Sequence, residues 1–252
     1  MAYQAEKTVP YASGGASKSE QIALMFNEIA SKYDRLNHSL SWGIDRSWRK
    51  KGISALKALA PKNLLDIATG TGDLAIEACR LLQPKKIVGI DISEKMMAVG
   101  RKKVAGAGLS GVIGIERQDC ADLRFEDNFF DAATVAFGVR NFGQLDRSLR
   151  EILRVLKPGG KLMMLELTAP KCFPIKQAYQ LYSKLIPFIG NRIAGNRTAY
   201  RYLTQSIAVF PQGKEMTAIL EKNGFQDVAC KRFTFGICLM YIGSKQHDNN
   251  LK

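Results

Sequence analysis

The sequence predicts an α/β fold, a doubly wound and mostly parallel seven-stranded sheet that ends in an antiparallel hairpin. Short apolar runs alternate with amphipathic segments between residues 63 and 168, and this alternation is typical of a parallel sheet with helices on both faces. Only Phe235-Gly236 separates the last two apolar runs. Strands joined by so short a turn pair in an antiparallel manner, because a parallel pair needs a long crossover.

Two helices are expected before the first strand. Apolar side chains recur at helical spacing over 19–32 and 48–59, and Pro61 stops the second helix. The turn Lys157-Pro158-Gly159-Gly160 is expected to end a later helix. The remaining periodicity predicts strands near 63–68, 86–91, 112–118, 130–137 and 161–168, helices at 73–82, 93–105, 145–156 and 213–223, and hairpin strands at 226–234 and 237–243.

These elements make up one domain. A chain of 252 residues, of which 46% are hydrophobic, can bury a full core. We expect a flexible lead-in at 1–18, a single domain at 19–245 and a tail at 246–252. The expected parts of the domain are N-terminal helices at 19–62, a cofactor-binding core at 63–169, an insertion at 170–212, and a final helix and hairpin at 213–245.

The composition argues against several classes of protein. No run approaches the roughly 20 apolar residues that span a bilayer, and no secretory signal is expected at the N-terminus. The five cysteines include no Cys-x-x-Cys pair, so we expect reduced thiols in the cytoplasm. With only two histidines, no metal site is expected.

The net charge of +14 is unevenly distributed. Residues 63–170 carry 15 Lys and Arg against 14 Asp and Glu, whereas residues 171–252 carry 12 against 4. Basic flanks of this kind attract an anionic surface, either nucleic acid or acidic lipid. A generally basic soluble protein is the simpler alternative.

The most informative stretch is 64–74, an apolar strand that enters the turn Gly70-Thr71-Gly72 and then a helix. A strand, a glycine turn and a helix in this order bind nucleotide-like cofactors. Glycines also occur in simple tight turns. The identity of a ligand therefore depends on the charges around the turn.

Those charges favour a cationic ligand. Asp66 ends the strand and Asp73 opens the helix, so two carboxylates face the place where a dinucleotide would put its pyrophosphate. The third glycine of a dinucleotide fingerprint is also missing, because Ala75 follows Leu74. A unit positive charge about 4 Å from a carboxylate gains roughly 4 kcal/mol at an effective dielectric constant of about 20. S-adenosylmethionine (SAM) carries an ammonium and a sulfonium and no phosphate, so the turn predicts a SAM site.

Two further carboxylates follow neighbouring strands. Asp91 closes the second strand, and its spacing from the glycine turn suits both hydroxyls of a ribose. Asp119-Cys120 follows the third strand, where Asp119 could accept a hydrogen bond from the exocyclic amine of adenine. Either aspartate could instead cap the segment that comes after it.

Residues 170–212 interrupt the alternation of strands and helices. This insertion is rich in aromatic and amphipathic runs with interspersed cations, including Tyr200-Arg201-Tyr202-Leu203 and Phe210-Pro211. In a doubly wound sheet it would cover the carboxyl ends of the strands. We expect a lid that shapes an apolar substrate cavity and contacts a membrane surface. Ordinary helix packing also accounts for most of these aromatic side chains.

Three segments together resemble one family, the ubiquinone/menaquinone biosynthesis C-methyltransferases. They are residues 33–48 (YDRLNHSLSWGIDRSW), 136–141 (AFGVRN) and 154–168 (RVLKPGGKLMMLELT). The insertion adds Pro187…Gly190 and the two motifs named above. The resemblance covers about residues 20–245. The RVLKPGG run is shared by many SAM methyltransferases, whereas the first segment and Gly-Val-Arg-Asn are more specific.

The resemblance implies the Rossmann-like fold of class I SAM-dependent methyltransferases. It also implies methyl transfer from SAM to a ring carbon of a prenylated naphthoquinol, which converts demethylmenaquinol to menaquinol. The benzoquinol step of ubiquinone biosynthesis, alone or as a second activity, is the alternative, and methylation of RNA or of a small soluble molecule is a more remote one. No RNA-binding motif accompanies the basic flanks, so no nucleic-acid partner is expected.

The family motif carries cofactor contacts over to several positions of this chain. Asp66 is added to the predicted cofactor-binding residues because of the charge argument above. The sequence departs from the family pattern at Asp45, where His is common, at Ala136, where Ser is frequent, and at Thr168, where Ser is usual. No base role is therefore assigned to Asp45, and no side-chain hydrogen bond to the cofactor at Ala136. The residues carried over are Thr71, Asp91, Asp119 and Cys120, with backbone groups of Gly70 and Gly72.

Methylation of a quinol carbon requires a neighbouring hydroxyl, with an unperturbed pKa of about 10, to lose its proton. Arg140 and Asn141 follow the fourth strand and are expected to orient the phenolate or a water relay, with Arg140 stabilising charge. Tyr33 could complete that relay from an N-terminal helix. The alternatives are a surface ion pair for Arg140 and core packing for Tyr33. His38 is more often a solvated or capping residue than a base.

The resemblance also implies an acceptor with an isoprenoid tail, which resides in the bilayer while the cofactor is cytosolic. We expect a cytoplasmic protein that associates peripherally with the anionic inner face of the cell membrane. The sequence leaves open whether the chain forms homo-oligomers.

Overall fold

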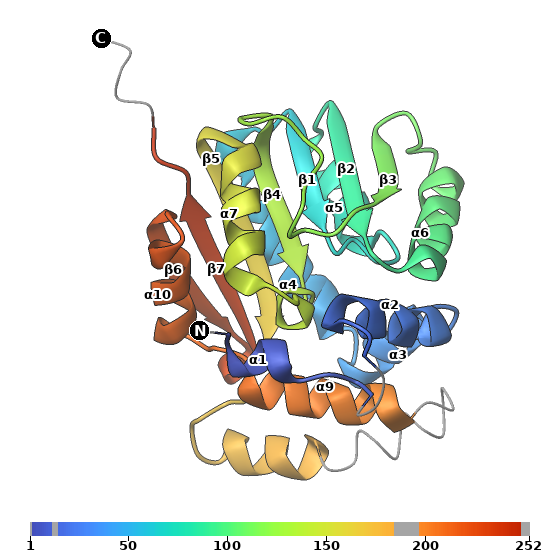
Figure 1. Ribbon diagram of the computed structural model, residues 1–252, viewed down its shortest axis with the longest axis vertical. Helices are drawn as coiled ribbons and strands as arrows, with labels where there is room; N and C mark the ends of the chain where they lie inside the picture. The colour runs from blue at the N-terminus through green and yellow to red at the C-terminus, as the bar shows by residue number, and fades with distance from the viewer. Residues whose placement is uncertain (1, 12–14, 184–196, 248–252) are drawn as a thin grey trace.

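A seven-stranded sheet forms the centre of the computed structural model, which describes residues 2–11, 15–183 and 197–247 (Figure 1). The strand order is β3-β2-β1-β4-β5-β7-β6. The parallel strands are β1 (Asn63–Ile67), β2 (Lys86–Asp91), β3 (Ile113–Arg117), β4 (Phe130–Ala136) and β5 (Leu156–Leu167). β6 (Gln226–Phe233) and β7 (Cys238–Ser244) form an antiparallel hairpin, and β7 also pairs with β5. The predicted doubly wound sheet with a terminal hairpin is confirmed.

Helices cover both faces of this sheet. On one face α4 (Ile44–Ser54) and α5 (Asp73–Leu82) contribute to an apolar layer that contains Leu64 of β1. On the other face α7 (Leu145–Val155) and α10 (Lys214–Lys222) contribute to a second layer that contains Leu65. Consecutive strand residues belong to opposite layers because side chains alternate along a strand. α6 (Glu94–Gly106) packs beside β3 at the edge of the sheet (Figure 1).

A further group of helices lies at the carboxyl ends of the parallel strands, at the bottom of Figure 1. They are α2 (Lys18–Ile29), α3 (Tyr33–Leu40), α9 (Arg197–Val209) and the helical residues 175–183. Met25 of α2 and Tyr202 of α9 belong to one buried apolar cluster. The N-terminal helices and the insertion therefore close together the edge where doubly wound sheets bind ligands.

Parts of three predicted segments lie outside the described residues. They are 1 and 12–14 of the lead-in, 184–196 of the insertion, which include the Pro187…Gly190 motif, and 248–252 of the tail. No helix in the part of the chain that the structure describes has the length and apolar character needed to cross a bilayer.

Several boundaries differ from those predicted. β5 begins at Leu156, because the Lys157-Pro158-Gly159-Gly160 segment continues the strand: Gly159 and Gly160 exchange backbone hydrogen bonds with Lys245. The second N-terminal helix begins earlier than expected and ends at Ser54, and α3 precedes it as an additional helix. Three short 3-10 turns lie at Lys57–Leu59 (η1), Val139–Asn141 (η2) and Thr234–Gly236 (η3).

The lead-in, expected to be flexible, contains a docked helix. α1 (Gln4–Lys7) approaches the start of α7, where the Glu6 carboxylate accepts a 2.6 Å hydrogen bond from the first backbone N–H of that helix. The buried ammonium of Lys18 donates to the carbonyl oxygens of Ala5 at 2.7 Å and Arg140 at 3.0 Å. Lys18 thereby ties the lead-in to the η2 loop.

Close backbone packing holds the glycine turn in place. Gly70 and Gly72 have φ angles of +55° and +79°, in the left-handed region that favours glycine. Gly100 of α6 packs against this turn, and a Cβ at that position would lie 3.1 Å from the carbonyl oxygen of Gly70 and 3.0 Å from the side chain of Ile115. Only glycine lets α6 approach the turn this closely.

Replacing Gly100 by Ala is expected to lower the free energy of unfolding by about 1–3 kcal/mol, because the added methyl group overpacks the turn. Urea denaturation followed by circular dichroism measures the change. Gly106→Ala on the same helix is the matched control, since a Cβ there meets nothing within 4 Å. It should be neutral or stabilising by about 0.5–1 kcal/mol, and equal effects at the two glycines would refute the packing argument.

Candidate functional site

Three cavities share walls at the carboxyl ends of the parallel strands. The first, of about 140 Å³, is mostly apolar and is enclosed by α2, α3, α9 and residues 175–183. The second, of about 70 Å³, and the third, of about 40 Å³, both reach the glycine turn at Gly70. Tyr33 and Phe137 line all three. The cavities therefore meet at these two aromatic side chains.

Asp91 lies in the wall of the second cavity, as its place at the end of β2 predicts. One carboxylate oxygen accepts a 2.8 Å hydrogen bond from the backbone N–H of Gly70, and the other accepts one of 2.8 Å from Ser93. Burial raises the pKa of Asp91, and these backbone hydrogen bonds act in the opposite direction. The carboxylate both fixes the glycine turn and presents its remaining lone pairs to the cavity.

Asp119 and Cys120 line the same cavity. The Asp119 carboxylate accepts a 2.9 Å hydrogen bond from the backbone N–H of Ala121, which is the contact of a local cap. Cys120 is buried, its Sγ lies 3.3 Å from Ser148 Oγ, and burial raises the pKa of its thiol. The structure thus brings three of the predicted residues, from the ends of two strands, into one cavity.

Asp66 lies in the wall of the third cavity and is fully buried. Its two oxygens accept hydrogen bonds from the hydroxyls of Thr69 at 2.7 Å and Thr134 at 2.8 Å. Burial raises the pKa of Asp66 to about 6. Thr71 lines the same cavity, but its hydroxyl donates to Asp34 at 2.6 Å. Above pH 6 this carboxylate places a negative charge beside the turn.

Two residues of the turn also have structural contacts that the sequence did not indicate. Asp73 is not a free carboxylate, because Lys103 of α6 forms an ion pair with it and Arg49 lies 3.5 Å away. Gly72 lines none of the three cavities and packs against Gly100 of α6, so its backbone contact with the cofactor stays a prediction. The contacts of Asp73 with Lys103 and Arg49 could not be foreseen, because both cations come from segments distant from Asp73 in the chain.

Asp45 is held by three donors at the border of the first cavity. Ser41 Oγ donates to it at 2.6 Å and Arg49 Nη1 at 2.7 Å, and His38 Nδ1 lies 3.0 Å away. Burial alone would raise the pKa of Asp45, but the Ser41 hydrogen bond, the Arg49 charge and His38 together lower it. A carboxylate with a lowered pKa is a weak base, which agrees with leaving Asp45 without a base role.

Arg140 is buried and forms an ion pair with a carboxylate that sequence reasoning missed. Its Nη1 donates to Glu166 Oε1 at 2.5 Å and to the carbonyl oxygen of Phe137 at 2.6 Å. The Nε of Arg140 has no partner among the described residues. The surface ion pair considered for Arg140 is therefore excluded. A single carboxylate within the apolar run of β5 was the signal that could have identified Glu166.

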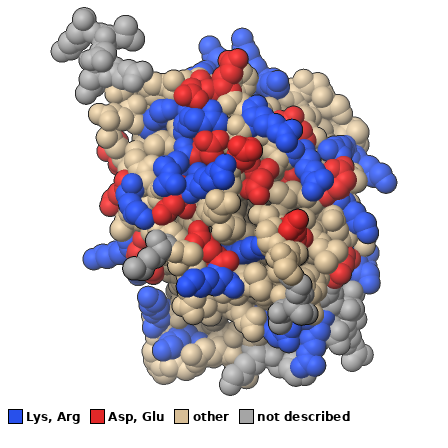
Figure 2. Space-filling view, in the orientation of Figure 1, with Lys and Arg blue, Asp and Glu red and all other residues tan. Residues whose placement is uncertain are grey.

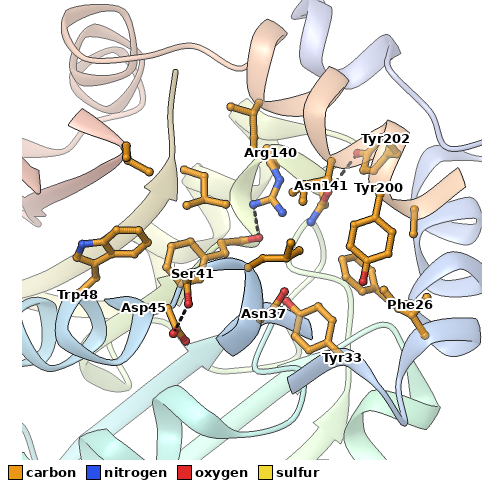
Figure 3. A pocket seen from close by; sticks show the side chains of 18 of the residues that line it. Phe26, Tyr33, Asn37, Ser41, Asp45, Trp48, Arg140, Asn141, Tyr200 and Tyr202 are labelled. Atoms are coloured by element: carbon orange, nitrogen blue, oxygen red, sulfur yellow. Dashed lines mark hydrogen bonds between the residues drawn. The ribbon is translucent and has the colours of Figure 1, made fainter. Parts of the chain in front are cut away.

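Asn141 and Tyr33 complete the polar part of the first cavity (Figure 3). The Asn141 side-chain oxygen accepts a 3.1 Å hydrogen bond from the hydroxyl of Tyr202 on α9. Burial raises the pKa of Tyr33, while the positive charge of Arg140 lowers it. Arg140, Asn141 and Tyr33 thus converge from the η2 loop and α3 on one cavity, as the motif-based prediction requires.

The second and third cavities together suit the predicted cofactor. Their charged lining residues in the described chain are four carboxylates and one guanidinium, that of Arg49. A diphosphate would meet mostly negative charge there, whereas a nucleoside that carries a sulfonium and an ammonium would be attracted. Ala136 lines both cavities, so the departure from the family pattern removes a hydroxyl from the wall that faces the cofactor.

Comparisons with known proteins point to one family. The model of the ubiE/COQ5 methyltransferase family matches residues 15–245. A demethylmenaquinone methyltransferase from Bacteroides fragilis is 53% identical over 246 residues, which are 97% of this chain and 100% of the relative. A ubiquinone/menaquinone biosynthesis C-methyltransferase UbiE from Geobacter sulfurreducens is 42% identical over 230 residues, which are 90% of each chain.

Solved structures share the fold at low sequence identity. A SAM-dependent methyltransferase from Thermotoga maritima has a TM-score of 0.59 at 19% identity, with 88% of this chain and 99% of that chain covered. The [4+2]-cyclase SpnF has a TM-score of 0.61 at 19% identity, with 91% and 96% covered. These similarities show the fold alone, and the chemistry has to be argued from the residues of the site.

Replacing Glu166 by Gln is expected to lower the free energy of unfolding by about 3 kcal/mol, because the buried Arg140 guanidinium loses its counter-charge. Chemical denaturation of the purified variant measures the loss. The control is the double variant Arg140→Met, Glu166→Gln, in which no unpaired charge remains, so much of the stability should return. If the double variant instead loses as much stability as the Glu166→Gln and Arg140→Met variants lose in sum, the two residues are not a coupled pair.

Proposed function

Since the chain belongs to the ubiE/COQ5 methyltransferase family, we propose that it methylates a ring carbon of demethylmenaquinol and so forms menaquinol. The chain is a SAM-dependent methyltransferase. The observation that carries the proposal is the meeting of the cofactor cavities with a larger apolar cavity at Tyr33 and Phe137. A methyl donor in one space and a flat apolar acceptor in the other would face each other there.

Two features support a naphthoquinol as the preferred acceptor. The relatives from Bacteroides fragilis and Porphyromonas gingivalis, which are 53% and 45% identical, are named for demethylmenaquinone. The wall of the first cavity is rich in aromatic side chains, which stack on fused rings. The name of the 42% identical relative covers both quinone pathways, so a benzoquinol is the second candidate.

The residues of the second and third cavities would hold the cofactor. Asp91 would accept from the ribose hydroxyls, Asp119 and Cys120 would contact the adenine, and Asp66 with the Gly70-Thr71 turn would bind the amino-acid end. The bound cofactor supplies an electrophilic methyl group on its sulfonium. The carboxylates select this cofactor because they stabilise positive charge and disfavour phosphate.

The polar residues of the first cavity would activate the acceptor. The guanidinium of Arg140 stabilises the phenolate and thereby lowers the pKa of the acceptor hydroxyl. Its Nε is an unused donor in a buried site, where a charge-assisted hydrogen bond to the phenolate would satisfy it. Asn141 and Tyr33 would position the same oxygen or a water that removes the proton. The apolar walls exclude other water.

Turnover with matched acceptors tests the proposal. The purified protein should convert a demethylnaphthoquinol to its C-methyl product with SAM, faster than it converts a benzoquinol with the same isoprenoid tail. Chromatography with mass detection identifies the product. Faster turnover of the benzoquinol would reverse the assignment of the acceptor, and no C-methylation of either quinol would end the proposal.

Replacing Arg140 by Lys keeps the buried positive charge beside Glu166 and removes Nε. We expect kcat to fall about 100-fold, the loss typical of one oxyanion donor, while the Kd for SAM stays within about twofold. Steady-state kinetics and calorimetric titration measure the two quantities. Arg147→Lys on the exposed surface of α7 is the control. Unchanged turnover of the Arg140→Lys variant would remove Arg140 from the reaction.

We also propose that the protein binds an anionic membrane surface around the mouth of the first cavity. Five exposed large apolar side chains each lie within two positions of a residue that lines this cavity. They are Leu24, Trp42, Ile44, Leu181 and Phe235. The hydrogen bond from Tyr182 to the carbonyl oxygen of Leu40, at 2.6 Å, holds two of their segments together. Cations are scattered over this end of the molecule (Figure 2), as binding to acidic lipid requires.

Trp42 offers a direct test, because the side chain of Trp42 is 87% exposed and that of Trp48, the other tryptophan, is 4% exposed. Vesicles that contain phosphatidylglycerol should shift the tryptophan emission to shorter wavelength, and high salt should reverse the shift. Trp42→Ser should abolish the shift, since Trp48 is already buried. An equal response to pure phosphatidylcholine vesicles, or none, would rule out this surface.

A further inference from the structure

The guanidinium of Arg49 stands at the boundary between the third and first cavities. It is the only cation that lines the third cavity within the described residues, and Arg49 is 8% exposed. Arg49 belongs to helix α4, in the N-terminal part of the chain, and lies at the carboxyl end of the sheet. Neither the glycine turn nor the family motifs pointed to it.

Two carboxylates hold one edge of this guanidinium. Asp45 accepts a 2.7 Å hydrogen bond from Nη1, and the carboxylate of Asp73 lies 3.5 Å from the same nitrogen. The ring of Phe137 lies beneath the guanidinium, with its centroid 5.7 Å from Cζ. These contacts fix the orientation of Arg49. Nε and Nη2 have no acceptor among the residues that the structure describes.

The third cavity is therefore lined both by Arg49, a guanidinium with two unpaired nitrogens among the described contacts, and by the carboxylate of Asp66. Such a wall complements a zwitterion, one whose ammonium meets the carboxylate and whose own carboxylate meets the guanidinium. A ligand carboxylate would otherwise face only the negative charges of Asp66 and Asp73, and its desolvation would be unfavourable. Arg matches a carboxylate better than Lys does, because its planar fork donates two parallel hydrogen bonds.

We propose that Arg49 binds the carboxylate of the methionine moiety of SAM and so selects an intact amino-acid end. The inference rests on the proposed cofactor and names the side chain that recognises its one anionic group. Lys103 is not an alternative, because it is paired with Asp34 and Asp73 and lines none of the three cavities. Asp45 gains a function in this way, since its carboxylate holds Arg49 in the orientation that binds the ligand.

Decarboxylated SAM, which lacks only this carboxylate, tests the assignment. Calorimetric titration gives the Kd of the full-length protein for SAM and for decarboxylated SAM. A charge-assisted hydrogen bond predicts that the wild type binds SAM about 10- to 100-fold more tightly. Arg49→Met should reduce this preference to less than about threefold, mainly because the variant binds SAM more weakly. Arg46→Met on the exposed side of the same helix should keep it.

The outcomes separate this inference from the function on which it rests. If the wild type binds neither compound, the cofactor itself is wrong. If the wild type prefers SAM and the Arg49→Met variant keeps that preference, SAM binding stands and Arg49 is not the carboxylate site. Arg49→Lys retains the charge beside Asp45 and loses the fork, so it serves if Arg49→Met does not fold. The Arg49→Lys variant should show a preference for SAM at least about threefold smaller than that of the wild type. If its preference equals that of the wild type, the inference is wrong.

Discussion

The buried ion pair between Arg140 and Glu166 is the constraint on which the site depends. A charge at this depth needs a counter-charge, so Glu166 in β5 fixes the loop after β4 that carries Arg140. That loop also presents Phe137 and Asn141 to the cavities. Other segments dock on it, since Lys18 donates to the Arg140 carbonyl and α9 reaches Asn141 through a tyrosine hydroxyl.

Local pairing of charges shapes the cofactor side. The carboxylates of this region differ in their partners. Among the described residues, Asp66 accepts from hydroxyl groups, Asp91 accepts from backbone N–H groups, and Asp73 is paired with a cation. The first two stay able to meet positive charge, whereas the third supports the structure. An acidic turn therefore attracts a sulfonium nucleoside without an excess of unpaired negative charge, and Arg49 adds the one positive group that a zwitterion requires.

The two halves of the reaction are built from different layers of the molecule. The segments at the carboxyl ends of β1, β2, β3 and β4, with one side of α2, line the proposed cofactor cavities, and the N-terminal helices with the insertion line most of the apolar cavity. Tyr33 from α3 and Phe137 after β4 stand where the layers meet. The sheet thus sets where the methyl donor lies, while the helical layer sets which acceptor can approach it.

The sequence by itself determined the elements whose signal is local. The alternation of short apolar runs with helical periods predicted the fold class and the hairpin, and the glycine turn with Asp91 predicted the cofactor edge, because each depends on near neighbours in the chain. The motif predicted Arg140 and Asn141 by resemblance. Tertiary structure alone decided the pairing of Asp73 with Lys103, the pairing of Glu166 with Arg140 and the position of Arg49 beside Asp73, because these contacts join segments far apart in sequence. No periodicity records such a contact, and only packing brings the charges within reach of one another.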